Sequence, residues 1–597
     1  MRVAVAALIG TITLVLRYLT LRGFPNDHYV HLARVQQVLL GAWPVRDYTE
    51  EGVPLTTLAS TVAQWVLGAG LWPEAVVTLA SLAMAAAVTT YVTSTITGSV
   101  VAGAWAGGLQ LLAFPRSYSH PKMLVYAVAI AAVWAYAAKP GRLKLLMLAV
   151  VAGLAFLVRH DHGLYTGAAL AVVVFAVDAR TSIAAAARAV AWFTVAALVV
   201  ASPWLVYVAT VDNLVSYFER GIQISRTEAV RTRLSWPRFK PDAEAAAEIV
   251  NVRWREHVTE AGRHETELAL KLEDGTAIGG RTWRYRLRDR SAAGAHAIVT
   301  SPAVEDTMYI DRSAQPGGSS FATPGNAAVL VYYAAIAAPA LLLIIATVAW
   351  IRRRPVARAP ASLALGIAAL GLIVSVGFLR EVLVERLADV FGVLPVACAL
   401  LGAAVWNMGA PAIRAVARVT VVLLLATFSA ATIRARNVAD EIDSSHLLGS
   451  GVGDRAQAVK AGLTVWPWPS QWPAGDGWRL AEYANACTRP TDRLVATWNV
   501  PELYFFARRG FAGGEAFLIP ALRRPDAIEQ DFLRRVANEP VPLIFIDRDG
   551  WSDVARLYPA IARWTALNYQ ERGTFTLDNG MVIRVMARAD SPCPPPA

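Results

Sequence analysis

Acidic side chains gather at one point of this chain where an apolar run ends, and their types suit acid–base chemistry. Asp27 follows the first apolar run with His28 beside it, and a second acidic pair, Asp47 and Glu50, precedes the next apolar run. A positioned carboxylate can take the proton of a hydroxyl group while that hydroxyl attacks an electrophilic carbon. The stretch 22–54 is therefore the first candidate for a catalytic site. The alternative is that these carboxylates are solvated and structural.

Charged residues interrupt the apolar runs at three later places, which are Arg116–Lys122 (RSYSHPK), Arg159–Gly163 (RHDHG) and Arg380–Arg386 (REVLVER). Ionisable side chains at membrane depth are costly unless they pair or line a cavity. Cations placed there can bind a phosphate through charge-assisted hydrogen bonds. We therefore predict substrate-binding roles for side chains of all three groups, namely Arg116, His120, Lys122, Arg159, His162, Arg380 and Arg386.

Three interpretations of the group at 159–162 are open. In the first, Arg159 contacts a phosphate and Asp161 orients an acceptor or acts as a second acid. In the second, these two residues form an interfacial ion pair. In the third, His160, Asp161 and His162 hold a metal ion, which is disfavoured because neighbouring side chains on a helix point in different directions.

Two other pairs have open interpretations. Arg380 and Arg386 either bind the donor or anchor a helix at the membrane interface. His28 and His31 are three residues apart and share a helix face. They line the site or lie at the surface.

The composition sets the class of protein in which these residues must be positioned. The chain has 597 residues, of which 55% are hydrophobic and 17% charged, whereas an ordinary soluble protein is roughly 25% charged. A cytosolic globular enzyme is excluded. The apolar residues form runs near the length of about 20 residues that crosses a bilayer as a helix. We expect a polytopic α-helical membrane protein with candidate spans at 3–21, 55–72, 74–96, 99–115, 122–138, 144–158, 163–178, 189–211, 326–351, 360–379, 389–408 and 418–434.

The basic residues orient these spans. Lys and Arg outnumber Asp and Glu by 56 to 45, which gives a net charge of +11. Much of the excess lies in short loops between apolar runs, as the positive-inside rule requires, so the expected partner is the lipid bilayer and not nucleic acid. With alternating spans, four clusters fall on one side, the cytoplasmic side, at 139–144, 180–188, 352–358 and 414–418.

The number of spans is 11 to 13 because alternation fails at one place. Arg2 puts the N-terminus in the cytoplasm and 22–54 outside. Three full spans between 55 and 115 would then put 116–121 inside, against the other clusters. Either one of these segments does not cross or one crossing is missing.

Four parts follow from this division: a membrane module at 1–211, an external β-rich insertion at 212–325, C-terminal transmembrane helices at 326–434 and an external α/β domain at 435–597. Period-two alternation predicts strands at 249–255 and 282–287. In the last part apolar strands alternate with helical stretches, and Asn579-Gly580 predicts a hairpin.

The chain has three cysteines, and Cys487 and Cys593 both fall in the exported C-terminal part. A disulfide between them in an oxidising compartment and two free thiols are equal alternatives. Cys398 lies in an apolar run, and this spacing implies no metal site. The last residues, 591–597, are predicted to form an extended, disordered end.

The segment 26–55 (NDHYVHLARVQQVLLGAWPVRDYTEEGVPL) resembles the first external loop of the GT-C superfamily of polytopic glycosyltransferases. That superfamily includes the protein O-mannosyltransferases, the lipid A aminoarabinose transferase and bacterial family-39-like enzymes. Its members have an acidic residue directly after the first span and interfacial helices before the second. The resemblance covers about residues 1–210 in layout. Many relatives carry paired acids at this point, whereas Asn26 and His28 flank Asp27 here, so the second acid stays open.

The resemblance implies an inverting hexosyl- or pentosyltransferase in the bacterial inner membrane. It would move a sugar from a polyprenyl-phosphate-linked donor to a glycan, lipid or protein acceptor at the external face. Asp27 matches the catalytic acidic position and would be the general base. Asp47 and Glu50 would orient the acceptor or hold a divalent cation, and no cofactor is certain.

Two other classes of protein stay open as alternatives. One is a transporter or flippase of lipid-linked glycans, a class that usually shows internal repeats and interrupted helices. The other is a non-catalytic assembly protein of the cell envelope, in which Asp27→Ala would leave the activity of the pathway intact.

Overall fold

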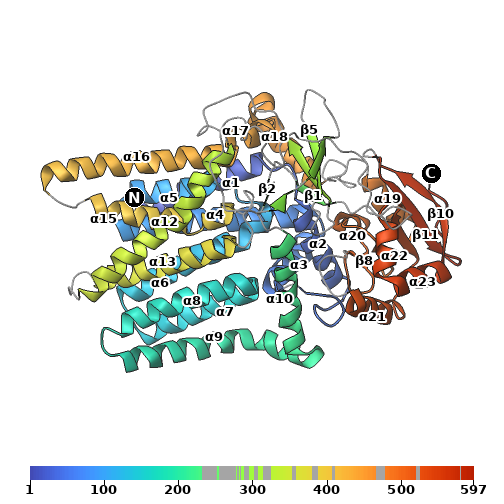
Figure 1. Ribbon diagram of the computed structural model, residues 1–597, viewed down its shortest axis with the longest axis horizontal. Helices are drawn as coiled ribbons and strands as arrows, with labels where there is room; N and C mark the ends of the chain where they lie inside the picture. The colour runs from blue at the N-terminus through green and yellow to red at the C-terminus, as the bar shows by residue number, and fades with distance from the viewer. Residues whose placement is uncertain are drawn as a thin grey trace.

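The computed structural model describes residues 1–50, 52–231, 324–352, 358–379, 387–406, 410–464, 477–518, 525–577 and 580–596, together with six short strands between 252 and 312. A bundle of long helices occupies one half of the molecule, and a smaller mixed domain sits at one end of that bundle (Figure 1). The expected fold class is confirmed: apolar helices of membrane length, a β-containing insertion and a C-terminal α/β domain.

The bundle contains α1 (Arg2–Leu19), α4 (Leu71–Thr97), α5 (Val100–Leu112), α6 (His120–Ala138), α7 (Arg142–Val158), α8 (His160–Asp178), α9 (Ile183–Val211), α12 (Pro324–Ile351), α13 (Arg358–Leu379), α15 (Leu394–Trp406) and α16 (Pro411–Ala435). Seven of the described helices are long and apolar enough to cross a membrane, and three shorter apolar helices accompany them. The largest buried apolar cluster runs between α4, α6, α8, α12 and α13.

Contacts between helix termini define two ends of this bundle. At the end that carries the C-terminal domain, Arg17 near the end of α1 donates to the carbonyl of Pro115, just after α5, at 2.8 Å. At the opposite end, Tyr136 of α6 donates to the carboxylate of Asp178, the last residue of α8, at 2.6 Å. We call these the domain end and the far end.

Helix α3 (Pro54–Leu67) turns a polar face to the protein interior and an apolar face outward, the reverse of a helix in a water-soluble protein. Most of its buried positions are polar, and its exposed large side chains are apolar. The former are Thr57, Ser60 and Gln64, and the latter are Leu58, Val62, Trp65, Val66 and Leu67. A helix in water buries its apolar face, so this arrangement fits a helix that lies against lipid.

Both ends of α3 lie at the domain end, so α3 does not cross the bundle. Thr56 in its first turn donates to the carbonyl of Val158, at the end of α7, at 2.8 Å. The start of α4 contacts helix α2 (Asn26–Leu39) through Glu74 and His28. If α3 is not counted as a span, only two spans lie between 55 and 115, and residues 116–121 fall on the external side with the other external loops. Among the described helices, the seven long ones together with α5, α7, α13 and α15 then give eleven crossings.

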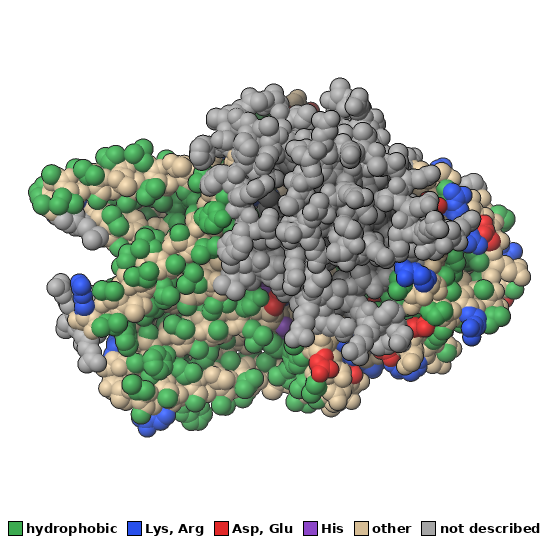
Figure 2. All heavy atoms as spheres, viewed as in Figure 1, with side chains coloured by type: hydrophobic (Ala, Val, Ile, Leu, Met, Phe, Trp, Pro, Cys, Tyr) green, Lys and Arg blue, Asp and Glu red, His purple; other side chains and the backbone are tan. Residues whose placement is uncertain are grey.

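The surface of the bundle has the character expected for contact with lipid. Its sides are hydrophobic, and Lys and Arg side chains appear at the far end (Figure 2). Exposed basic residues of that end include Lys139, Arg142, Arg188 and Arg352. A bilayer has a hydrocarbon core between two polar headgroup layers. The apolar sides of the bundle match that core and its charged far end matches a headgroup layer, so the structure supports a membrane-embedded bundle.

The insertion begins with a helix that the sequence did not predict, α10 (Leu214–Arg231). Its described strands are β1 (Val252–Trp254), β2 (Ala277–Ile278), β3 (Arg281–Thr282), β4 (Arg284–Leu287), β5 (Ala295–Thr300) and β6 (Thr307–Arg312). Four of them form an antiparallel sheet in the order β1-β6-β5-β4, and β2 pairs with β3. The alternating stretches at 249–255 and 282–287 thus contain strands, as predicted.

The C-terminal part begins with two helices beside the bundle, α17 (Val438–Asp443) and α18 (Leu447–Thr464). The domain proper comprises α19 (Trp478–Cys487), β7 (Arg493–Ala496), α20 (Pro501–Ala507), β8 (Gly510–Phe511), α21 (Pro525–Val536), β9 (Leu543–Asp547), α22 (Trp551–Leu557), α23 (Pro559–Asn568), β10 (Tyr569–Thr576) and β11 (Val582–Arg588). Its five-stranded sheet has the order β10-β11-β9-β7-β8, with parallel pairs at β9-β7 and β7-β8.

In this domain a proline and an Asn-Gly pair shape the local structure. The helical stretch after β9 is divided into α22 and α23, because a residue that precedes proline disfavours the helical conformation and Tyr558 adopts φ −127° before Pro559. The predicted hairpin joins β10 to β11, where Gly580 has φ +79° and its amide donates to the carbonyl of Leu577 at 2.7 Å.

Helix α2 joins the bundle to the C-terminal domain. Nine of its fourteen residues are buried, so it is enclosed on most sides. Its Tyr29 ring packs against Phe506 of α20 with 5.3 Å between ring centroids. Gln37 donates to the carbonyl of Phe511 in β8 at 2.6 Å. The helix that follows the first span therefore has the C-terminal domain as one of its walls.

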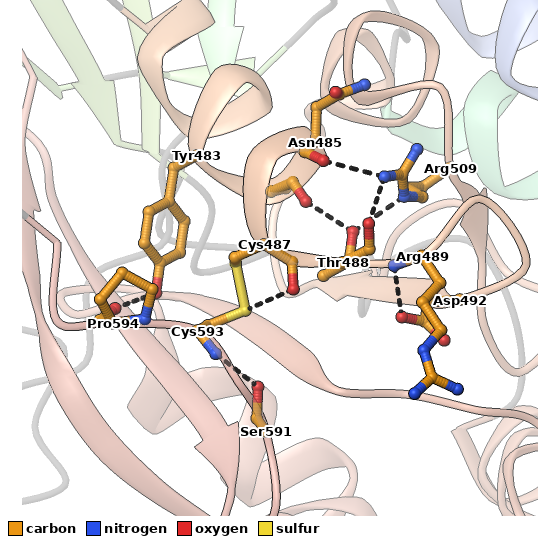
Figure 3. The surroundings of a disulfide bond; sticks show 11 residues. Tyr483, Asn485, Cys487, Thr488, Arg489, Asp492, Arg509, Ser591, Cys593 and Pro594 are labelled. Carbon is orange, nitrogen blue, oxygen red and sulfur yellow. Dashed lines mark hydrogen bonds between the residues drawn. A yellow bond between two sulfur atoms is a disulfide. The ribbon is translucent and has the colours of Figure 1, made fainter.

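A disulfide between Cys487 and Cys593 closes the C-terminal domain (Figure 3). It joins the end of α19 to the tail that follows β11, and Tyr483 donates to the carbonyl of Pro594 beside it at 2.7 Å. Of the two sequence alternatives, the disulfide is confirmed. The expectation of a disordered end is wrong for residues 591–596, because this bond and this hydrogen bond tie the tail down.

We predict that Cys487→Ser lowers the free energy of unfolding by about 2 to 4 kcal/mol, because the unfolded chain gains the freedom that a cross-link removes. The measurement is the melting temperature of the full-length protein in detergent without reductant. Cys398→Ala keeps the disulfide and is the control. A melting temperature of Cys487→Ser equal to that of the control would contradict the prediction.

Candidate active site

Asp27 occupies the first turn of α2 at the domain end of the bundle. Pro25 is the N-cap residue of this helix, and its ring fixes φ at a value compatible with helix entry. The Asp27 side chain is 63% exposed, and its Oδ2 lies 3.9 Å from Nη1 of Arg116. The positive end of a helix dipole stabilises a carboxylate in the first turn. Asp27 is thus an accessible carboxylate with a guanidinium beside it.

His28, the residue after Asp27, is fully buried and paired with a carboxylate from another helix. Its Nε2 lies 2.6 Å from Oε1 of Glu74, and its Nδ1 lies 3.1 Å from the hydroxyl of Ser117. An ionised carboxylate only accepts hydrogen bonds, so Nε2 carries the hydrogen of the short contact. The pair fixes the ring of His28 and, with it, the start of α2.

Sequence reasoning missed Glu74. It stands alone in the first turn of α4, within an apolar run, and both it and His28 are completely buried. A single carboxylate inside a hydrophobic span is the signal that could have found it, because such a group must have a partner or a function. Its second oxygen, Oε2, has no hydrogen-bond partner in the described part of the chain.

Two more histidines complete this buried group. His31 lies one turn beyond His28, with its Nε2 2.9 Å from the hydroxyl of Ser60 and 3.9 Å from Glu74. Burial lowers the pKa of His31 to about 3, so this ring is neutral. His120 stacks on His28 with 6.2 Å between ring centroids. His28, His31 and His120 are thus buried partners of Glu74 and not surface residues.

Arg116 and Lys122 flank the short helix η1 (Ser117–Ser119) and have different surroundings. The Arg116 side chain is 39% exposed and faces Asp27. Lys122 is buried and forms an ion pair with Asp389 of α14 (Leu387–Val390). Burial raises the pKa of the Asp389 carboxyl, but Lys122 outweighs this and holds that pKa at about 2. Arg116 is therefore the accessible cation, and Lys122 is the enclosed one.

The residues Arg159 to His162 form a second charged group at the start of α8. The guanidinium of Arg159 donates to the Asp161 carboxylate at 2.9 Å, and His162 makes a hydrogen bond with the hydroxyl of Tyr126. The charges of Lys122 and Asp389 act on His162 as well. The ion pair between Arg159 and Asp161 is thus present, and this group is continuous with the Lys122–Asp389 pair.

The metal interpretation of 160–162 finds no support in the described residues. His160 turns away from its neighbours, with Nδ1 2.7 Å from the carbonyl of Phe156 and Nε2 2.9 Å from the hydroxyl of Tyr217. In the described part of the chain, no group of three or more His, Cys, Asp or Glu side chains could hold a metal ion.

Glu50 is buried in the loop before α3 and accepts three hydrogen bonds. The donors are the amides of Gly52 at 2.8 Å and Val53 at 2.5 Å and the hydroxyl of Tyr217 at 2.5 Å. Gly52 has φ +84°, and a Cβ at this residue would lie 3.0 Å from the ring of His160. The carboxylate thus holds a tight turn against the start of α8.

Asp47 lies in the loop between α2 and α3. Its carboxylate accepts from the guanidinium of Arg46 at 2.9 and 2.6 Å and from the amide of Trp43 at 2.7 Å. Burial opposes its ionisation, but these hydrogen bonds prevail and lower the pKa of Asp47. Arg380 and Arg386 lie outside the described residues. The structure thus brings together Asp27 with Arg116, and Arg159 with Asp161.

A second missed carboxyl comes from the C-terminal domain. Glu502 in the first turn of α20 is 2% exposed, and its Oε1 accepts from the side-chain amide of Asn26 at 3.0 Å. Asn499 donates to the other amide atom of Asn26 at 3.0 Å. The sequence could not show this contact, because 476 residues separate Asn26 from Glu502.

Comparison with known proteins gives a distant likeness in structure alone. No protein-family model matches the chain, and no sequence among the curated proteins matches it. It is similar to the crystal structure of ArnT from Cupriavidus metallidurans bound to undecaprenyl phosphate, with 14% identity and a TM-score of 0.43, over 100% of this chain and 98% of that chain. For the apo state of the same protein the values are 16% and 0.40, over 98% and 97%. At these TM-scores the likeness does not assign an activity, so the function is proposed from the residues of this chain.

We expect His28→Ala to destabilise the protein by about 3 to 5 kcal/mol, because it leaves the Glu74 carboxylate buried without its partner. Adding Glu74→Met to that variant should restore part of the lost stability, since no buried charge then remains. Melting temperatures in detergent give the measurement, with His446→Ala, at an exposed histidine, as the control. The prediction is wrong if the double variant melts below His28→Ala.

Proposed function

We propose that this chain is a GT-C-type glycosyltransferase that moves a sugar from a polyprenyl-phosphate-linked donor to an acceptor at the external face of a bacterial inner membrane. One observation carries the proposal. The accessible Asp27 carboxylate lies 3.9 Å from the Arg116 guanidinium at one end of an apolar helical bundle. A base beside a cation at a membrane surface suits a hydroxyl that attacks a sugar while a lipid-linked phosphate leaves. The resemblance of 26–55 to the first external loop of that superfamily supports the same reaction.

In the proposed reaction Asp27 takes the proton of the acceptor hydroxyl while the hydroxyl oxygen attacks the anomeric carbon. The bond between that carbon and the phosphate oxygen breaks, and the lipid phosphate leaves with the electron pair. Attack from the face opposite the phosphate inverts the configuration at the carbon. Arg116 is placed to stabilise the negative charge that develops on the leaving phosphate.

The second charged group supplies further cations for the donor. Arg159 is held by Asp161 at 2.9 Å, so we assign phosphate binding to Arg159 and its positioning to Asp161. Lys122 is held by Asp389 in the same way. His120 is buried, His162 makes a hydrogen bond with the hydroxyl of Tyr126, and we assign both to the polar wall of the site. Arg380 and Arg386 stay predicted donor contacts.

The remaining acids of the first loop have a different proposed task. Glu50 has both oxygens occupied by hydrogen bonds from its own turn and from Tyr217, and Asp47 is held by Arg46. We assign to them the shape of the loop at 43–53. In that position they border the space where an acceptor glycan, lipid or protein would approach Asp27.

The proposed orientation follows from the charges at the two ends. The far end carries exposed Lys139, Arg142, Arg188 and Arg352, and short loops rich in Lys and Arg stay in the cytoplasm. The domain end then faces the external, oxidising side, with the C-terminal domain and its disulfide. Disulfides persist in such compartments, which supports the same orientation.

The position of the charged groups favours an enzyme over a transporter. Transporters bind their substrate near the middle of the bilayer, between interrupted helices. In the described part of this chain, the charged groups around Asp27, Glu74 and Arg159 gather where helices begin at the domain end. A surface site of this kind suits transfer to an acceptor that approaches from outside.

We predict that Asp27→Asn lowers the rate of transfer by about 10² to 10⁴-fold, the usual contribution of a general base, without changing the melting temperature. The measurement is sugar transfer by the purified protein from a panel of polyprenyl-phosphate sugars. Asp443→Asn, at an exposed carboxylate of α17, is the matched control. Absence of transfer from every donor by the wild type, or an unimpaired Asp27→Asn, contradicts the proposed function.

A second variant tests the cation. Arg116→Gln should raise the KM for the donor by about 10 to 100-fold, because a hydrogen bond to a charged group contributes about 1.5 to 3 kcal/mol. Arg116→Lys keeps the charge and should recover part of the loss. Steady-state kinetics over a range of donor concentrations give both values. An unchanged KM in Arg116→Gln would remove Arg116 from the donor site.

A further inference from the structure

Glu502 of the C-terminal domain reaches the turn of the chain that carries Asp27. Its carboxyl accepts from the Asn26 side chain at 3.0 Å, and Asn499 donates to the same side chain at 3.0 Å. Both amide atoms of Asn26 are therefore held by the loop and helix of a domain more than 470 residues away in sequence. Asn26 is the first residue of α2, and Asp27 is the second.

We propose that Glu502 is a positioning residue for Asp27: its carboxyl holds the first turn of α2, and its ionisation adds negative charge beside the general base. The inference rests on the proposed function, because it takes Asp27 as the base. It makes the C-terminal domain a part of the active site and not only a cover over it.

The surroundings of Glu502 explain why its charge is adjustable. The side chain is almost completely buried, and the titratable groups that face it are Asp27 and Tyr29, both from α2. Burial, together with the negative charge of Asp27, raises the pKa of Glu502 from an ordinary value of 4.5 to about 7, against the hydrogen bond from Asn26. The Arg116 guanidinium lies 3.9 Å from the carboxylate of Asp27.

Ionisation of Glu502 should strengthen the base. The negative charge of ionised Glu502 disfavours the ionised form of Asp27, so the Asp27 carboxylate becomes a stronger proton acceptor. The Asn26 amide also donates more strongly to a charged acceptor than to a neutral one. Transfer should therefore become faster as the pH rises through 7, by about three-fold if the affinity of Asp27 for a proton rises about ten-fold.

Glu502→Gln separates this coupling from a purely structural role. The amide oxygen of Gln can still accept from Asn26, but the side chain cannot ionise near neutral pH. We expect transfer rates of the wild type to show an ionisation near pH 7 that Glu502→Gln lacks, with similar rates at pH 5.5. Glu515→Gln, which removes a carboxylate bonded to Thr49 across the same domain contact at 2.7 Å, should keep the wild-type profile.

A stability measurement tests the titration without any activity. A buried acid whose pKa is raised on folding stabilises the fold fully below its unfolded pKa, and that contribution disappears as the pH rises through the folded value. The wild-type melting temperature should therefore fall between pH 5 and pH 8 by more than that of Glu502→Gln. If Glu502→Gln does not fold, Asn26→Ala serves instead: it should slow transfer and retain the ionisation.

The outcomes separate the inference from the proposed function. No transfer by the wild type overturns the proposed function, whatever the melting curves show. Active wild type with an inactive Asp27→Asn, but with the same pH profile and melting curves in Glu502→Gln as in the wild type, overturns the inference alone. Loss of the ionisation and of the pH-dependent melting in Glu502→Gln supports it.

Discussion

The site depends on one buried charge, the carboxylate of Glu74. It lies at the start of a helix of 27 residues, with no exposed surface, and an unpaired carboxylate there would cost several kcal/mol. The contact with His28 at 2.6 Å meets this requirement. His28 follows Asp27 directly in the sequence. The pairing that offsets the cost of burying the Glu74 carboxylate therefore also fixes the candidate base at the end of the bundle.

The same constraint explains why the first external segment is not a free loop. Helix α2 has His28 and His31 on the side of the bundle and Tyr29 on the side of the C-terminal domain. Helix α3 directs Ser60 inward to His31 and its apolar face outward. Polar side chains thus meet inside the protein at this level, while lipid-facing positions stay hydrophobic. Such a region can hold a charged reaction at the edge of a membrane.

The sequence predicts much of the fold, because hydrophobic runs and short turn signals act locally. The spans, the strands of the insertion and the alternation of the C-terminal domain follow from periodicity. The disulfide and the role of α3 do not, since both depend on contacts across the fold. Asp27 and Arg116 could be picked out because each interrupts or follows an apolar run. Glu74 was missed, although a lone carboxylate within such a run is itself a signal, and Glu502 was hidden by its distance along the chain from Asn26.

The central claim is that donor phosphate binds at the domain end, beside Asp27. A cryo-electron microscopy structure of the full-length protein in lipid nanodiscs with a polyprenyl phosphate tests this most directly. The account predicts phosphate density within about 2.7 to 3.2 Å of the Arg116 guanidinium, with the Asp27 carboxylate facing the position of the sugar. Phosphate bound at the far end, beside Arg142 and Arg352, with the surroundings of Asp27 empty, would contradict it.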